Sequence, residues 1–130
     1  MKILQPPRWP RPKGYANGIS ARGRTIFTAG VVGWDESERF PAKDLPGQFR
    51  QVLVNICAIL AEDDAGPEHI VRMTCYVTSR DDYVAGAGEI GAAWRELIGR
   101  NFPAMAVVEV SALVEPQAKV EIEAIAVVPD

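Results

Sequence analysis

Histidine and cysteine are scarce in this chain, and their scarcity excludes several kinds of site. There is one histidine, His69, and there are two cysteines, Cys57 and Cys75. A Ser-His-Asp or Cys-His pair would depend on His69 alone, which we interpret as a surface or capping residue. A metal site needs clustered ligands, and these three residues offer none. Both cysteines lie in strongly apolar segments, which is typical of buried, reduced thiols.

The chain also lacks a long apolar run and a basic stripe. No run approaches ~18 apolar residues, so a membrane span is not expected. The prolines from Pro6 onward interrupt the N-terminus too early for a secretory leader, and we therefore expect a cytoplasmic protein. The 14 lysines and arginines are dispersed in a chain of net charge −3, which argues against nucleic acid as a partner.

What is present is enough apolar sequence for one domain. The chain has 130 residues, 48% of them hydrophobic, and we treat 1–130 as a single domain with a proline-rich extended arm at 1–13. Helical spacing of apolar residues predicts a helix from Leu45 to Asp63, capped by Asp44. A second helix is predicted over Tyr83–Gly99, capped by Asp81 or Asp82. The predicted strands are Tyr15–Ser20, Arg24–Ala29, Ile70–Val77, Ala104–Leu113 and Lys119–Val128.

The order of these elements, ββαβαββ, predicts an α+β fold in which both helices cover one face of a mixed β-sheet. The last two strands carry apolar residues on both faces. In the final strand Val120 and Ile122 point to one side, and Ile125 and Val127 point to the other. A monomer would leave the second face exposed to water, so we expect an oligomer that buries it, with a few glutamates at the subunit boundary.

The chain resembles the reactive-intermediate deaminase (Rid, or YjgF-like) family over residues 14–128. The resemblance is carried by matching residues in order: Gly14-Tyr15, Thr25–Ala29 ending at Gly30, Gln48, Asn55, Leu60, Val71, Tyr76-Val77, Phe102-Pro103-Ala104 and Val120–Ala126. It implies a chorismate-mutase-like fold and a homotrimer with clefts between subunits. Family members of the best-known type hydrolyse 2-imino or 2-enamino acids to 2-oxo acids and ammonia without a cofactor.

By position, the resemblance implies that Tyr15 and Gly30 line the cleft and that Glu123 holds or activates the attacking water. A glutamate in a partly dry cleft is suited to the role of general base. The alternative is that Glu123 is a satisfied glutamate at the subunit interface. Asn17 and Trp34 are further candidates for contacts with a ligand at the cleft mouth. The alternative for Tyr15 and Trp34 is that they only close the subunit boundary.

One departure from the family pattern bears on the substrate. Met105 stands where the family has the arginine that binds the substrate carboxylate, and a thioether cannot make charge-assisted hydrogen bonds. Losing that contact costs about 2–5 kcal/mol of binding. Val31 and Val107 make the expected pocket more apolar as well. Either another arginine substitutes, with Arg24, Arg72 and Arg100 as candidates, or the ligand is less charged. The alternative is that Met105 serves only for packing.

Three functions follow, in order of expectation. The first is cofactor-free hydrolysis of an imine or enamine other than a standard 2-imino acid. The second is a trimeric, non-catalytic protein that binds a small metabolite or a partner. The third is a nuclease, a label attached to some relatives, which the absence of a basic groove and of a histidine pair makes least expected.

Overall fold

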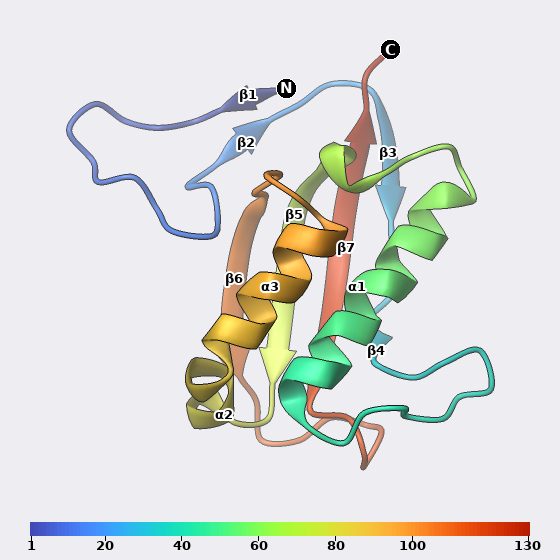
Figure 1. Ribbon diagram of the computed structural model, residues 1–130. Helices are drawn as coiled ribbons and strands as arrows, with labels where there is room; N and C mark the ends of the chain where they lie inside the picture. Colours follow the sequence, from blue (N-terminus) through green and yellow to red (C-terminus); the bar gives the residue numbers. More distant parts are fainter.

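The computed structural model describes all 130 residues and contains one main sheet with helices on one side of it (Figure 1). The elements are β1 (Lys2–Ile3), β2 (Ile19–Ser20), β3 (Arg24–Phe27), β4 (Val31–Val32), α1 (Leu45–Ala61), a short 3-10 helix (Pro67–His69), β5 (Ile70–Val77), α2 (Arg80–Ala85), α3 (Ala87–Leu97), β6 (Ala104–Glu109) and β7 (Val120–Val128). The main sheet has the order β3-β7-β5-β6, and β4 also pairs with β7. Within this sheet only the β5–β6 pair is parallel.

The predicted first helix is confirmed as α1, which ends two residues before the predicted end. Asp44 caps it, accepting a hydrogen bond from the Gly47 amide at 3.3 Å. Its apolar stripe packs on the sheet, with Phe49, Leu53 and Ile56 fully enclosed. The α+β architecture with helices on one face is therefore as predicted.

The predicted second helix is wrong in its continuity and in its cap. It is two helices, α2 and α3, separated at Gly86, whose backbone (φ −89°, ψ 8°) departs from α-helical values. The N-cap of α2 is Ser79, whose hydroxyl accepts a hydrogen bond from the Asp82 amide at 3.1 Å, rather than Asp81 or Asp82. Both acidic residues instead lie in the first turn, where carboxylates stabilise a helix N-terminus.

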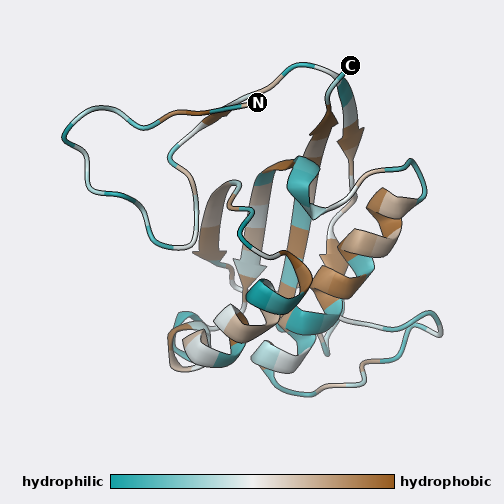
Figure 2. Ribbon diagram, turned by 45° about the horizontal axis from the view of Figure 1, so that its top comes forward, coloured by the Kyte–Doolittle hydropathy of each residue, from teal (hydrophilic) through white to brown (hydrophobic).

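The N-terminal region differs most from the prediction. Only Ile19–Ser20 of the predicted first strand is extended, and it pairs with Lys2–Ile3 rather than with the main sheet. The intervening loop projects from the body in both views (Figures 1 and 2). It is attached through the Ala16 amide, which donates to the Pro103 carbonyl at 2.9 Å. The main sheet gains instead the unpredicted strand β4, Val31–Val32, which is too short to show a periodic pattern.

The two faces of the main sheet follow from the register. We call the side under α1 and α3 the helix-covered face; it includes Met73, Cys75, Ile122 and Ala124, all buried. The opposite side is the open face, and no other element of the chain packs over it (Figure 1). Strand registers place on it Phe27, Arg72, Thr74, Tyr76, Ala104, Ala106, Val108, Glu121, Glu123 and Ile125.

Of these elements, no helix has the length and hydrophobicity needed to cross a bilayer.

Candidate functional site

Gly30 and Trp34 line one groove of about 680 Å³, between the loop after β3 and the outer side of α1. Asn55 of α1 holds this loop in place. Its side-chain amide donates to the carbonyls of Val32 at 3.1 Å and Trp34 at 2.8 Å. Along α1 the groove wall combines apolar residues such as Val54 and Ile59 with the amides of Gln51 and Asn55, while Asp35 and Glu36 bring carboxylates to its other side. Such a groove is large enough for a small metabolite.

Position 30 must be a glycine because the side chain of Glu121 lies against it. Sequence reasoning missed Glu121 as a residue of the site. A Cβ atom built on Gly30 would lie 2.7 Å from Oε2 of Glu121, so the glutamate side chain rests directly on the glycine backbone. Glu121 is half-buried and pairs with Val32 of β4. Strand alternation places it on the same face as Glu123, and that alternation was the available signal.

Glu123 lies on the open face and is exposed in the single chain. The Tyr76 hydroxyl donates to its Oε1 at 2.8 Å, and this hydrogen bond is the main cause that raises the pKa of Tyr76. Glu123 also lines a hollow of about 310 Å³ together with Arg72 and Thr74. The general-base hypothesis requires a carboxylate in a partly dry cleft, which the single chain does not provide for Glu123.

Met105 lies on the other face of the sheet. It pairs with Met73, points to the helix-covered side, and lines a cavity of about 370 Å³ with residues of α1, α2 and α3. Val107, two residues along β6, faces the same way and is exposed at the edge strand. Met105 and Glu123 therefore do not share a cavity within one chain.

Tyr15 and Asn17 belong to the N-terminal region. Tyr15 is exposed beside Ala16, which bridges to Ala104 at the start of β6. Asn17 is exposed too, and its amide donates to Oε1 of Gln5 at 3.0 Å within the arm. Both residues lie at the β6 edge of the sheet, away from Gly30 at the other edge. The single chain thus brings Gly30 and Trp34 together, places Tyr15, Asn17 and Met105 toward the β6 edge, and leaves Glu123 on the open face.

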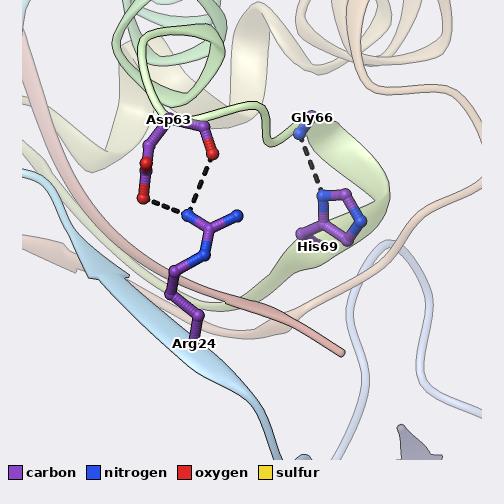
Figure 3. Close-up of polar contacts among 4 residues, drawn as sticks. All are labelled: Arg24, Asp63, Gly66 and His69. Atoms are coloured by element: carbon purple, nitrogen blue, oxygen red, sulfur yellow. Dashed lines mark hydrogen bonds and ion pairs between the residues drawn. The ribbon is translucent and has the colours of Figure 1, made fainter. Parts of the chain in front are cut away.

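The three arginines that were candidates for replacing the family's carboxylate-binding residue lie in different surroundings. Arg24 is engaged, donating to the backbone carbonyl of Asp63 at 2.9 Å and pairing with its carboxylate (Figure 3). Arg100 is exposed in the loop between α3 and β6. Arg72 alone lies beside Glu123, in the hollow of the open face.

His69 and the cysteines have structural surroundings. Nδ1 of His69 accepts a hydrogen bond from the Gly66 amide at 3.0 Å, which makes the histidine a local cap (Figure 3). Burial raises the pKa of Cys75 to about 12, so its thiol stays protonated and unreactive at neutral pH. Cys57 is only half-buried, less than expected, and desolvation raises its pKa as well.

Comparison with known proteins places these features in a family. A family model described as endoribonuclease L-PSP matches residues 10–128. The chain belongs to the endoribonuclease L-PSP (YjgF/Rid) family. It is 32% identical to a RutC family protein of Synechocystis, over 99% of this chain and 98% of that protein. It is 33% identical to the 2-iminobutanoate/2-iminopropanoate deaminase of Salmonella typhimurium, over 87% of this chain and 86% of that protein.

The fold agrees with solved structures of the Rid family. The crystal structure of the Rid protein YyfB from Yersinia pestis, described as of unknown function, superposes with a TM-score of 0.82 at 30% identity and covers 98% of each chain. The resemblance stated from the motifs is therefore confirmed at the level of family and fold. The Rid family label alone does not select a substrate for this chain.

Proposed function

We propose that this protein is a cofactor-free hydrolase that converts a reactive imine or enamine to the carbonyl compound and ammonia. The observation that carries the proposal is the open face of the sheet. There, Glu123 is held by Tyr76 at 2.8 Å, Arg72 lies beside it, and Glu121 rests on Gly30. The family relative named as a 2-iminobutanoate/2-iminopropanoate deaminase supports this class of reaction.

We assign the general-base role to Glu123. Water attacks the carbon of the C=N bond, a new C–O bond forms, and the water proton passes to the carboxylate. That proton passes to nitrogen, which gives a carbinolamine. The remaining hydroxyl proton then reaches nitrogen through the carboxylate, the C–N bond breaks as the C=O bond forms, and ammonia leaves. One carboxylate oxygen accepts the Tyr76 hydrogen bond, which orients the group and leaves the second oxygen free for the water.

The site requires more than one chain. Met105, Tyr15 and Val107 lie at the β6 edge, while Gly30, Trp34 and the two glutamates lie elsewhere on the sheet. The open face carries exposed apolar residues such as Phe27, which is 71% exposed. A homotrimer in the cytoplasm would bury that face and bring Glu123 into a dry cleft beside a neighbour's β6. Light scattering that finds a monomer at micromolar concentration would contradict this arrangement.

The substrate differs from a standard 2-imino acid because Met105 cannot bind a carboxylate. The decisive experiment generates 2-iminopropanoate with an amino-acid oxidase, traps the remaining imine as its semicarbazone, and follows loss of that product. Wild type is expected to be nearly inactive, and Met105→Arg to gain about tenfold or more. In the Met105→Arg background, Glu123→Gln should remove the gain and the neighbouring Glu121→Gln should retain most of it.

Two results would change the proposal. If Glu121→Gln removes activity and Glu123→Gln does not, the base assignment is wrong. If wild type and Met105→Arg are both silent while the oligomer is intact, the cleft is a binding site for a metabolite or partner and the hydrolase is excluded.

A further inference from the structure

The cavity behind Met105 has the features of a ligand-binding site. It lies among α1, α2, α3 and β6, measures about 370 Å³, and is lined mainly by apolar and aromatic side chains. Four aromatic residues contribute walls. Trp94 and Phe102 have nearly parallel rings, 7° apart with centroids at 6.4 Å, and Phe49 meets Tyr83 edge-on. Cavities of this size and composition hold one-ring ligands.

The cavity is open because glycine occupies two of its lining positions. A Cβ atom on Gly91, in the middle of α3, would have only Nη1 of Arg95 within 4 Å, at 3.4 Å. A Cβ atom on Gly14 would meet nothing within that distance. Glycine inside a helix is unfavourable relative to alanine, so Gly91 weakens α3 while leaving this space unfilled. A larger side chain at position 91 would enter the cavity.

Trp94 contributes a hydrogen-bond donor that lacks an acceptor. The residue is 7% exposed, and its indole Nε1 is buried with no hydrogen-bond partner in the protein. A buried donor that is left without an acceptor is costly, and most such groups in native proteins find one. An occupant that carries an acceptor and reaches the indole edge would satisfy it.

The charges around the cavity favour a neutral occupant. Arg95 is the only charged residue that lines it, and this side chain is exposed at the rim, where water screens its charge. The interior offers no cation to compensate a desolvated carboxylate and no carboxylate to compensate an amine. An ionised ligand would therefore lose its hydration without gaining an ion pair inside the cavity.

We propose that the cavity behind Met105 binds a neutral, single-ring aromatic compound that carries a carbonyl oxygen. The ring would lie among Phe49, Tyr83, Trp94 and Phe102, and the oxygen would accept the Trp94 indole hydrogen. This inference deepens the proposed hydrolase, on which its meaning for substrate choice rests, by naming a ring-bearing substrate. Its test measures binding without turnover, so the two proposals fail separately.

The test titrates the full-length protein with benzamide and records the indole ¹H–¹⁵N signals of Trp9, Trp34 and Trp94. Benzamide should shift the Trp94 signal and leave those of Trp9 and Trp34 in place. Benzoate should bind at least about tenfold more weakly, since its charge is desolvated. Cyclohexanecarboxamide, which keeps the carbonyl and lacks the aromatic ring, should also bind more weakly.

Matched variants on α3 separate the cavity from the rest of the surface. Gly91→Leu should fill the space and weaken benzamide binding about tenfold or more, whereas Ala92→Leu, the neighbouring exposed position, should leave it unchanged. Gly91→Leu replaces a glycine inside a helix with a better helix former, and Ala92→Leu exchanges two good helix formers, so loss of folding is not expected. Failure of benzamide to shift the Trp94 signal, equal loss in both variants, or tighter binding of benzoate that depends on Arg95 would each overturn the proposal.

Discussion

The helix-covered face and the open face of the sheet are built from alternate residues of the same strands, yet they bury their side chains very differently. Along β7, Val120, Ile122, Ala124 and Ala126 are enclosed under the helices. The intervening residues, Glu121, Glu123 and Ile125, remain exposed or half-buried in the single chain. One face is covered by helices of the same chain, and the other is left uncovered in the single chain.

The polar groups follow the same division. The helix-covered side is almost wholly apolar, with Gln48 as its fully buried polar residue. The open face combines apolar side chains such as Phe27 with Arg72, Tyr76 and two glutamates. Apolar contacts make the chain fold, whereas the polar groups on the open face contribute little to folding and are available for chemistry.

The largest expected effect comes from truncating one isoleucine on each face of β7. Ile122→Ala creates a cavity at a fully enclosed position and should lower the free energy of unfolding by about 2–5 kcal/mol at any protein concentration. Ile125→Ala removes the same atoms from the open face, and its cost should grow with protein concentration as assembly is weakened. Urea denaturation at several concentrations measures both. If both variants lower the free energy of unfolding equally at every protein concentration, the open face is not an assembly surface.

The next effect concerns the polar residue inside the apolar side. Nε2 of Gln48 donates to the carbonyls of Gln117 at 2.9 Å and Ala42 at 3.2 Å, and its Oε1 accepts from the Lys119 amide at 2.7 Å. Gln48→Leu leaves these backbone groups without partners and should lower the free energy of unfolding by about 2–4 kcal/mol.

Gln51→Leu, one turn further along α1, is the matched control for Gln48→Leu. Gln51 is half-buried and donates only to the Asn55 side chain, so its loss should cost below about 1 kcal/mol. Urea denaturation compares the pair. A cost for Gln48→Leu no larger than that of the control would show that water replaces the lost partners.

Much of the helix-covered side could be predicted from sequence because its residues repeat with a clear period. Leu45, Phe49, Val52 and Ile56 mark α1, and the alternation in β5 and β7 marks the two long strands. Val71 is an exception to this alternation, because a bulge between Ile70 and Arg72 shifts the register of β5. The two-residue strands β1 and β4 are too short to show any period.

The candidate site was less accessible to sequence reasoning because its parts meet only in three dimensions. Glu123 and Gly30 could be named from motifs, but the contact between Gly30 and Glu121 follows from the pairing of β4 with β7. The cavity behind Met105 depends on Phe49, Trp94 and Phe102, which lie on different elements. Spacing along the chain does not reveal which of these side chains leave a space between them.

The smallest expected effect tests how tightly the open face holds its glutamate. The pKa of Tyr76 is raised above its ordinary value of 10.0, first by the hydrogen bond to Glu123, then by burial and by the charges of Glu123 and Glu121, with Arg72 opposing. The neutral phenol is therefore favoured in the folded chain. Its contribution to stability is present below the ordinary pKa and is lost as pH rises through the raised one.

Glu123→Gln should lower the pKa of Tyr76 toward its ordinary value, because the variant removes the negative charge that disfavours tyrosinate. Glu121→Gln, the matched change two residues away on the same face, should lower it less, since Glu121 acts through space without the hydrogen bond. The near-ultraviolet absorbance of tyrosinate follows both titrations. A larger shift from Glu121→Gln would mean that Tyr76 does not hold Glu123 in solution. The orientation assigned to the general base would then be lost, and the open face would be only a surface for assembly.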